Sequence, residues 1–468
     1  MARRAPAPDA PPDDAPDTPA LRATRTVLDD LFGSRAERTF AVRLWDGRVE
    51  LPDHATAPFT LVLRRPGALR RMLLPLTELS IVEAYLFGDI DVEGDLEAAA
   101  DLGDVIARHV GSTGALLALA RHVLALPDDD ATSDAASDGL PDEGPGGVAR
   151  VRAARRLWRV GRAHTPERDR TAVRHHYDVG NDFYALWLDQ RMVYSCAYFE
   201  PGTDDLDAAQ VAKLDLVCRK LRLAPGERLL DIGCGWGALV RHAATHYGVE
   251  AVGITLSEPQ AALARERIAA AGLSERCSVQ VIDYRALRDE RGFDKISSVG
   301  MVEHVGLARL PDYFAAAHRL LRPRGLFLNH GIVGIAAARP STLRDRALGR
   351  LWRRNAFIHT YVFPDGDLVP VASMIAAAEG AGFETRDMES LREHYTRTLR
   401  HWVARLERRE RDAVSLVGES TYRVWRLYMA AAAYGFRSGR IGLVQTLLAK
   451  PDDRGAVDIP PTRDDLYS

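Results

Sequence analysis

The residues best suited to chemistry form a nine-residue run from Leu229 to Gly237, with the sequence LLDIGCGWG. A strand-like segment leads into Asp231, and Gly233, Gly235 and Gly237 follow before a helical pattern begins. Glycines let the backbone turn sharply and approach a ligand, while a helix N-terminus supplies free N–H groups. Because an acid precedes the glycines, its carboxylate can bind a cationic amino-acid group, which suits S-adenosylmethionine better than a pyrophosphate. The alternative is a glycine-rich structural turn.

Two later segments offer further groups to the same cofactor. GITLSEPQ ends a second strand-like run and supplies Thr255, Leu256 and Gln260 where many methyltransferases carry an acid for the ribose hydroxyls. A third run ends in Asp283 and Tyr284, an acceptor for adenine and a ring to stack on it. These two residues equally suit a helix-capping pair.

The elements that must position these residues alternate between strand-like and helical patterns from Leu221 to Val333. The strand-like runs are RLLDIG, EAVGIT, SVQVID, DKISSV and GLFLNHGIV. This alternation predicts an α/β, Rossmann-like parallel sheet with helices on both faces. Beyond it, the chain to about Lys450 reads as mainly helical.

A smaller α+β domain is expected before this sheet. Strand-like runs at Phe40–Leu44 and Phe59–Leu63, a hairpin turn at Asp46-Gly47 and a helical pattern over Leu79–Tyr85 precede the turn-rich FGDIDVEGD and more helix. The predicted divisions are a disordered tail (1–20), an N-terminal lipid-handling domain (21–126), a flexible acidic linker (127–149), a catalytic domain (150–450) and a C-terminal tail (451–468).

Bulk composition narrows the class of protein. At 468 residues the chain exceeds one hydrophobic core, and 46% hydrophobic with 27% charged residues indicates a soluble globular protein. A net charge of -3 argues against general nucleic-acid binding, and the four cysteines form no metal-binding spacing. No run is long enough to span a membrane and the start lacks a signal peptide, so a cytoplasmic protein is expected.

Two basic stretches modify that expectation. One covers residues 150–162 and includes Trp158 among six arginines, and the other covers residues 339–354. Arginines can bind lipid phosphates while an aromatic side chain sits at the interface, which predicts peripheral binding to the anionic inner face of the cell membrane. A solvated helix face or linker is the alternative.

Several unconnected motifs together resemble the cyclopropane-fatty-acyl-phospholipid synthase family, which is related to mycolic acid cyclopropane synthases. They appear in the family's order between about Arg174 and Thr446, and are HHYDVGNDFYALWLDQRMVYSCAYFEPG, LLDIGCGWGALVRHAATHYGVEAVGITLSEPQ, MVEHVG, FIHTYVFPDG and LREHYTRTLRHW. The resemblance implies the class I methyltransferase fold and an S-adenosylmethionine-dependent transferase. In this family a substrate alkene attacks the activated methyl, and bound bicarbonate then removes a proton so that a cyclopropane ring closes.

The resemblance also implies roles for particular residues. Bicarbonate would be held by Cys196, Glu303, His330, the backbone of Ile332, and Tyr395. Tyr, His and a thiol can donate hydrogen bonds to an anion, whereas each residue alone also suits an ordinary core or capping position. The cofactor would be bound by the residues already named and by Trp236, with Tyr177, Tyr194 and Ser195 on a lid. Tyr198, Phe199 and Tyr434 are candidates for the acyl channel or for the core.

Small departures from the family pattern keep the product open. Asn329 and Gly331 flank His330, where the family usually places Thr after the histidine, and Asp365 replaces a common glycine. A related enzyme that loses a different proton would leave a methylene or methyl branch, which is the alternative product. Methylation of a soluble molecule and non-catalytic lipid binding are the other classes considered. The expected partners are an unsaturated phospholipid and a second copy of the chain in a homodimer.

Overall fold

The computed structural model describes residues 16–53, 56–128, 179–335, 357–363 and 366–467. These residues form two compact units. Unit 1 contains residues 16–128, 357–362 and 418–434 of the described chain, and unit 2 contains the rest. Both basic stretches, nearly all of the predicted linker, Tyr177 and Asp365 lie outside the described residues.

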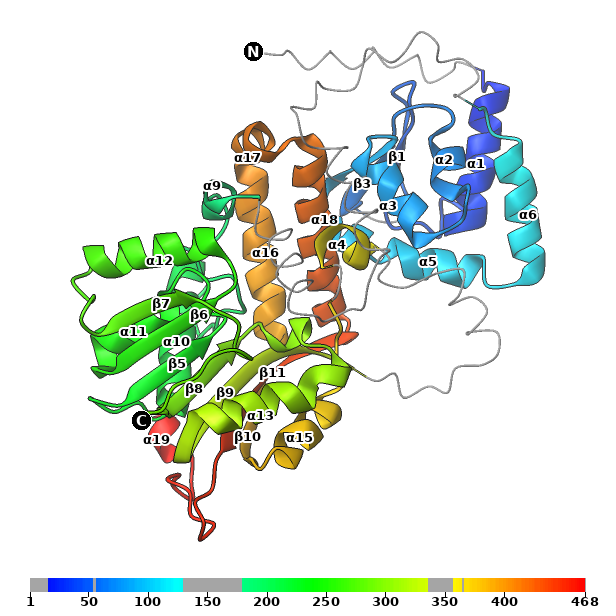
Figure 1. Cartoon of the computed structure of the whole chain (residues 1–468). Coiled ribbons are helices and arrows are strands. Elements are labelled where there is room, and N and C mark those ends of the chain that lie inside the picture. Colours follow the sequence, from blue (N-terminus) through cyan, green and yellow to red (C-terminus); the bar gives the residue numbers. More distant parts are fainter. Residues whose placement is uncertain (1–15, 54–55, 129–178, 336–356, 364–365, 468) are drawn as a thin grey trace. The chain divides into compact units, whose positions relative to one another are not determined.

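Unit 1 is an α+β domain (Figure 1), and its four-stranded sheet has the order β2-β1-β3-β4. Its strands are β1 (Ala41–Arg43), β2 (Val49–Glu50), β3 (Phe59–Leu63) and β4 (Ile90–Gly94). Its helical segments are α1 (Pro19–Phe32), α2 (Ala68–Leu73), α3 (Glu78–Leu86), α4 (Leu96–Ala99), α5 (Leu102–His109), α6 (Thr113–Leu124), η5 (Ile358–Val362) and most of α18 (Glu419–Arg437).

The local predictions for unit 1 are largely confirmed. β1 and β2 pair antiparallel around Asp46-Gly47, and α3 covers the expected helix. The purely turn-like interpretation of FGDIDVEGD was wrong, because β4 runs through it and pairs with β3. Ile90 and Val92 alternate with more exposed residues there, so their burial favours a strand over a turn.

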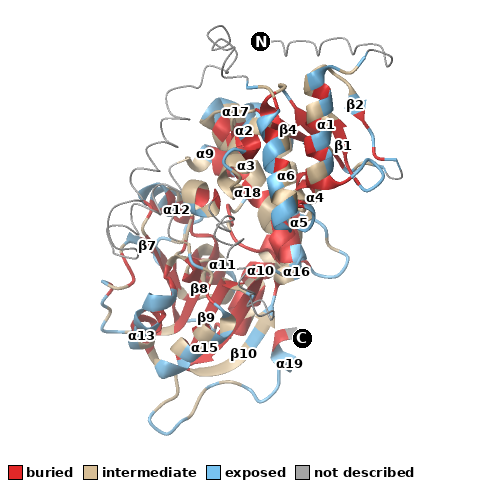
Figure 2. Cartoon of the chain, turned by 90° about the vertical axis from the view of Figure 1, so that its right-hand side faces the viewer, coloured by how far each residue is buried: buried red, intermediate tan, exposed pale blue. Residues whose placement is uncertain are grey.

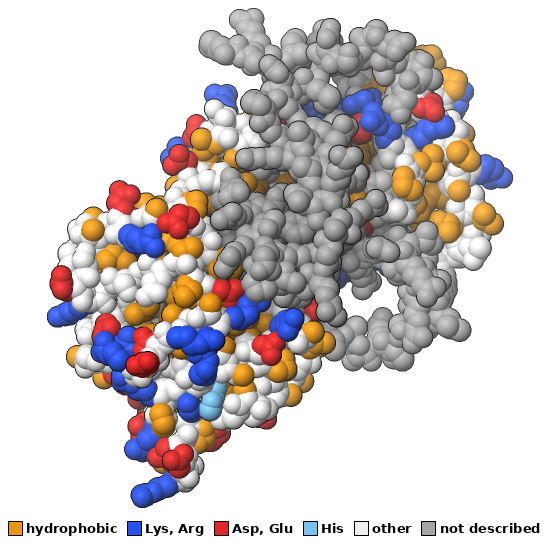
Figure 3. Space-filling view, in the orientation of Figure 1, with side chains coloured by type: hydrophobic (Ala, Val, Ile, Leu, Met, Phe, Trp, Pro, Cys, Tyr) orange, Lys and Arg blue, Asp and Glu red, His pale blue; other side chains and the backbone are white. Residues whose placement is uncertain are grey.

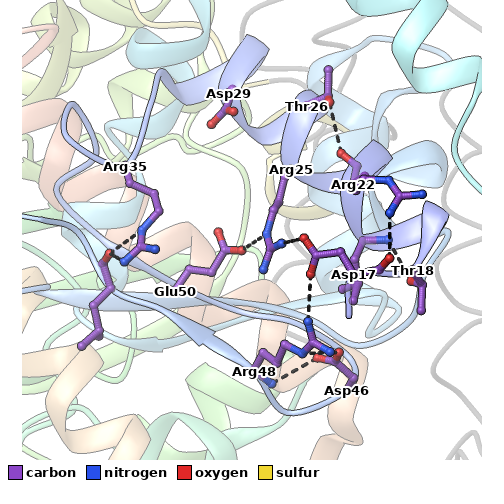
Figure 4. Close-up of polar contacts among 12 residues, drawn as sticks. Asp17, Thr18, Arg22, Arg25, Thr26, Asp29, Arg35, Asp46, Arg48 and Glu50 are labelled. Carbon is purple, nitrogen blue, oxygen red and sulfur yellow. Dashed lines mark hydrogen bonds and ion pairs between the residues drawn. The ribbon is translucent and has the colours of Figure 1, made fainter. Parts of the chain in front are cut away.

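An ion-pair network fastens the start of α1 to the β1–β2 hairpin (Figure 4). Arg25 on α1 binds Asp17 and also Glu50 of β2, whose side chain is 7% exposed. Arg48, from the hairpin, binds Asp17 with an N···O distance of 2.9 Å. Partly exposed pairs contribute about 0.2–1 kcal/mol each, so this network mainly fixes the position of the helix end.

Unit 2 is built on a seven-stranded sheet of order β10-β11-β9-β8-β5-β6-β7 (Figure 1). Its strands are β5 (Arg228–Ile232), β6 (Glu250–Thr255), β7 (Cys277–Val281), β8 (Phe293–Val299), β9 (Leu321–Gly334), β10 (Glu384–Ser390) and β11 (Ile441–Ala449). The strands from β9 to β7 pair in parallel, and β11 is antiparallel to both β9 and β10. The predicted α/β fold and its five strands are confirmed. The described C-terminal part is mainly helical, as expected, but it also contributes two strands that were not predicted, β10 and β11.

Helices cover both faces of this sheet, and the strands between them are largely buried (Figure 2). The helical segments are α9 (Asn181–Ala185), α10 (Leu206–Lys220), α11 (Ala238–Tyr247), α12 (Glu258–Ala270), η3 (Val302–His304), η4 (Leu307–Arg309), α13 (Leu310–Leu320), α15 (Val371–Gly380), α16 (Arg392–Arg408), α17 (Glu410–Val417) and α19 (Asp464–Tyr467).

Strand alternation sends neighbouring residues into two separate cores. Leu229 and Leu328 pack with α10, α11 and α12, whereas Leu230 and Phe327 pack with α13 and α15. Full burial of such a side chain contributes roughly 1.5–3 kcal/mol, so these cores hold the strand ends firmly in place. The segment expected as a C-terminal tail packs on this unit, where Leu466 is 1% exposed. Within the described residues, no helix is long and apolar enough to cross a membrane.

Candidate active site

The glycine loop lies where β5 ends and α11 begins. The N–H groups of Gly233 and Cys234 both donate to the carbonyl of Ile254, at 2.9 and 3.0 Å. Gly233 has a φ of 80°, and a Cβ there would lie 2.5 Å from Cγ of Met301. Gly237 has a φ of 76° and forms the N-cap of α11. Only glycine satisfies both the backbone conformation and the space at Gly233.

A cavity opens beside this loop, at the carboxyl ends of the parallel strands. This is the edge where open α/β sheets bind ligands. The predicted cofactor residues that line it are Tyr194, Ser195, Asp231, Gly233, Gly235, Trp236, Thr255, Leu256, Gln260, Asp283 and Tyr284. The structure thus brings together residues from four separate sequence motifs.

Asp231 is the acid that the sequence proposed for the cationic end of the cofactor. Its carboxylate is 3% exposed and accepts a hydrogen bond from the hydroxyl of Ser297 at 2.8 Å. Burial raises the pKa of Asp231 to about 6, against the opposing effects of Ser297 and the positive charge of Lys213. The carboxylate is therefore mostly ionised at neutral pH and is suited to a cationic partner.

Lys213 is a cavity residue that the sequence interpretation missed. It projects from α10, is 2% exposed, and donates to the hydroxyl of Ser195 at 2.9 Å. Burial lowers the pKa of Lys213 to about 8, although Asp189, Cys196 and Asp231 act in the opposite direction. Lys213 contributes a cation to the cavity lining and Asp231 contributes an anion. The amino-acid end of S-adenosylmethionine also carries one charge of each sign, so the residues present fit this cofactor.

The groups expected near ribose and adenine are held by their own neighbours. The Thr255 hydroxyl donates to the side-chain carbonyl of Gln260 at 3.1 Å. The Asp283 carboxylate accepts from the guanidinium of Arg285 at 2.9 and 2.5 Å, so it is already paired. The Tyr284 ring contacts Tyr313 edge-on, with ring centroids 5.5 Å apart.

A second cluster joins η3 to β9. The Glu303 carboxylate accepts the N–H of Ile332 at 2.6 Å through Oε1. Its other oxygen, Oε2, is buried, as is Nε2 of His330, and neither atom has a hydrogen-bond partner among the described residues. Burial raises the pKa of Glu303 to about 7 and holds the pKa of His330 well below its usual range. Buried polar atoms without partners are rare, and they mark a place where a small polar group could bind.

Cys196 and Tyr395 meet at the start of α16. The Cys196 thiol lies 3.8 Å from the carbonyl of Leu391, and that carbonyl also accepts the N–H of Tyr395 at 3.1 Å. Burial raises the pKa of the Cys196 thiol, so it stays protonated at neutral pH. Leu391 is bonded in turn to Leu443 of β11. The described contacts thus join Glu303 to Ile332, and they place the Cys196 thiol and the N–H of Tyr395 at the same carbonyl, whereas His330 contacts Gln445.

The three aromatic candidates for the acyl channel have other contacts. Tyr198 stacks on His394, with centroids 4.7 Å apart, and Phe199 lies under the guanidinium of Arg397. The Tyr434 hydroxyl belongs to unit 1 and lies 2.6 and 2.7 Å from carboxylate oxygens of Asp101 and Asp104. These contacts stabilise α16 and unit 1, respectively.

Asn329 and Gly331, which depart from the family pattern on either side of His330, point away from the His330 side chain. Asn329 faces α13 and α15, where it accepts from the Tyr313 hydroxyl at 2.9 Å and donates to the sulfur of Met374. A Cβ on Gly331 would lie 2.1 Å from Cγ1 of Val302, the residue before Glu303. Gly331 therefore affects the position of Glu303 through the packing of the neighbouring Val302.

The parallel sheet, the glycine loop and the charged cavity define a class I S-adenosylmethionine-dependent transferase. The chain belongs to the mycolic acid cyclopropane synthetase family, whose model matches residues 164–446. The resemblance expected from the motifs is therefore confirmed.

Individual relatives extend the match beyond the catalytic unit. A probable fatty acid methyltransferase of Pseudomonas putida is 38% identical over 426 residues, covering 91% of this chain and 95% of that protein. The cyclopropane-fatty-acyl-phospholipid synthase of Escherichia coli K12 is 36% identical, covering 65% of this chain and 71% of that protein. The crystal structure of mycolic acid cyclopropane synthase CmaA1 complexed with SAH and CTAB has a TM-score of 0.56 at 35% identity, covering 60% of this chain and 98% of that one.

Proposed function

We propose that this enzyme transfers a methylene carbon from S-adenosylmethionine to the cis double bond of an unsaturated acyl chain in a membrane phospholipid, forming a cyclopropane ring with bicarbonate as base. The observation that carries the proposal is that Glu303 Oε2 and His330 Nε2 are each buried without a hydrogen-bond partner among the described residues. The Escherichia coli relative named for this reaction on phospholipids supports the substrate class.

The residues of the second cluster fit a small oxyanion. When bound, S-adenosylmethionine supplies the activated carbon and bicarbonate accepts the proton. Burial raises the pKa of Glu303 to about 7, so the protonated form is accessible near neutral pH. A protonated Oε2 can donate to the anion, whereas an ionised carboxylate would repel it.

Ile332, Cys196 and Tyr395 complete the proposed site in different ways. The N–H of Ile332 donates to Glu303, so this residue orients the carboxylate and leaves Oε2 for the ligand. Cys196 keeps its proton, and its thiol lies 3.2 Å from the carbonyl of Ala197, so it would have to turn from that carbonyl to donate to the anion. Tyr395 is 7% exposed and packs on Trp402 and Phe436, which helps to exclude water from the site.

A methylene or methyl branch remains the second candidate product. Two relatives that match more than nine-tenths of this chain, from Pseudomonas putida and Mycobacterium tuberculosis, are named as probable fatty acid methyltransferases. Gly331, which lets Val302 approach the strand closely, is the local feature that could alter how the base is placed.

Expression in a bacterial host that makes only cis-monounsaturated phospholipids tests the proposal. Mass spectrometry of the fatty acids should reveal a cyclopropane acyl chain that an empty vector does not produce. Methylene or methyl branches alone would replace the ring-forming reaction with the second candidate, and unchanged lipids would contradict both.

We further propose that unit 1 docks peripherally on the anionic inner face of the cell membrane. Leu117 and Leu124 of α6 are 69% and 61% exposed, and their spacing of seven residues places them on one side of the helix. Apolar side chains gather over this part of unit 1 in the view of Figure 3. Inserting one leucine into lipid contributes roughly 1.5–3 kcal/mol, or a factor of about ten to a hundred in binding.

Co-sedimentation with vesicles of phosphatidylglycerol tests this surface. Leu117→Glu should weaken binding at least tenfold, and Leu416→Glu, at an exposed leucine of α17, is the matched control. Equal binding by both variants would show that α6 is not part of the membrane-binding surface. The expected homodimer is a separate proposal, which light scattering of the full chain would test.

A further inference from the structure

A buried chain of side chains leads away from His330 through three other elements. Nδ1 of His330, on β9, lies 3.1 Å from the side-chain nitrogen of Gln445, on the neighbouring strand β11. The side-chain oxygen of Gln445 accepts from Nζ of Lys220, at the end of α10, at 2.6 Å. Lys220 also pairs with Glu389 of β10. His330, Gln445 and Lys220 are each 1% exposed, so water does not compete for these bonds.

The donor and acceptor roles in this chain leave one arrangement. A protonated lysine can only donate. Burial lowers the pKa of Lys220, while its ion pair with Glu389 acts in the opposite direction and favours the protonated form. The atom of Gln445 that faces Lys220 must therefore be the amide oxygen. The amide NH2 group then faces His330 and can only donate, so Nδ1 of His330 must accept and carry no proton.

We infer that Gln445 and Lys220 are positioning residues that hold His330 as the neutral tautomer with its proton on Nε2, the buried atom that would donate to the proposed anion. The relevance to the reaction rests on the proposed function, whereas the tautomer itself does not. Nε2 is the ring atom that lacks a partner among the described residues.

The other tautomer would present a lone pair at this position. A lone pair repels an oxyanion, whereas an N–H donates to it, so the orientation of a single amide decides whether His330 helps or opposes bicarbonate. Charge on the ring is disfavoured as well, because His330 is fully buried near the cations Lys213 and Lys220. In metal sites and serine proteases, a hydrogen-bond partner at one ring nitrogen of a histidine fixes its tautomer in the same way.

Nitrogen-15 NMR of protein labelled at histidine measures the tautomer without substrate or bicarbonate. The chain has 14 histidines, so a His330→Gln variant assigns the signal. In the wild type we expect a non-protonated Nδ1 and a protonated Nε2. In Gln445→Glu the new carboxylate still accepts from Lys220, but its second oxygen can only accept, so Nδ1 should become protonated. A wild-type signal with a protonated Nδ1 would overturn the inference.

A matched control lies next to Gln445 on the same strand. Thr446 faces the opposite side of the sheet and donates to the backbone carbonyl of Asn329 at 3.1 Å. Thr446→Val should therefore leave the His330 signals as in the wild type. If Gln445→Glu does not fold, Lys220→Met provides the second test, because a released amide can rotate and a population with protonated Nδ1 should appear. An unchanged tautomer in either folded variant would contradict the inference.

Binding and turnover separate this inference from the proposed function. Gln445→Glu should bind S-adenosylhomocysteine as the wild type does but lose about 10²-fold or more in kcat, the range expected for a misdirected acid–base group. If the wild-type enzyme shows the expected tautomer but forms no lipid product, the proposed function is contradicted and the inference about His330 is not. Full turnover in a Gln445→Glu protein with an altered tautomer would show that the tautomer of His330 does not matter for the reaction.

Discussion

Replacing Glu303 with glutamine separates the chemistry of this side chain from its shape. The amide oxygen can keep the hydrogen bond from the N–H of Ile332, and the amide nitrogen takes the place of the buried Oε2. Packing and an N–H donor are therefore preserved, while the ability to take up a proton from the protonated bicarbonate is removed. We expect turnover to fall by about 10²–10⁴-fold, with affinity for S-adenosylhomocysteine unchanged.

The same substitution should change how stability depends on pH. The pKa of Glu303 is raised from 4.5 to about 7 in the folded protein, so between these values the folded state holds more protons than the unfolded state. The free energy of unfolding contributed by this group therefore falls as pH rises from 4.5 to 7. A shift of about 2.5 units corresponds to roughly 3 kcal/mol, lost in full above pH 7.

Glu303→Gln should consequently be the more stable protein at pH 8, by up to about 3 kcal/mol, and gain nothing below pH 4.5. Chemical denaturation of both proteins across this range measures the difference, since all other titrating groups are shared. Parallel stability profiles would refute the assignment of a buried, destabilised carboxyl group. Wild-type turnover in the variant would refute its role in the reaction.

Two further substitutions test the cofactor cavity and the packing of strand β9 next to Glu303. Lys213→Met removes a cation that lowers the pKa of Asp231. The pH below which affinity for S-adenosylhomocysteine falls should therefore rise above about 6 in calorimetric titrations; superimposable profiles would contradict this coupling. Gly331→Ala places a Cβ 2.1 Å from Val302 and should lower the unfolding free energy by about 1–3 kcal/mol. Adding Val302→Ala should recover part of that loss, and no recovery would rule out this contact as the cause.

The sequence predicted the part of the fold whose signals are local. Apolar runs such as RLLDIG and EAVGIT became β5 and β6, because a strand buried on both faces is apolar throughout. β10 was missed because its sequence, ETRDMES, is polar and only its pairing with β11 makes it a strand. β11 is a mostly apolar run of nine residues, and periodicity alone does not distinguish such a run from a segment of a buried helix. Its pairing with β9 makes it a strand.

A similar division holds for the candidate site. Asp231 and its glycines could be recognised from sequence because one short segment contains both the turn and the acid. Lys213, Lys220 and Gln445 could not, because charged or amide side chains on a helix or strand usually face solvent. Their burial depends on elements far away in the chain, which no local pattern reports.

The central claim is that this chain alkylates the double bond of a phospholipid acyl chain from S-adenosylmethionine. Incubation of the purified full-length protein with vesicles of cis-monounsaturated phosphatidylglycerol and methyl-labelled S-adenosylmethionine tests it most directly. We expect label in a cyclopropane acyl chain, at a rate that falls when bicarbonate is removed and falls again in Glu303→Gln. Label that never enters the acyl chain, with the cofactor bound and the protein folded, would contradict the claim.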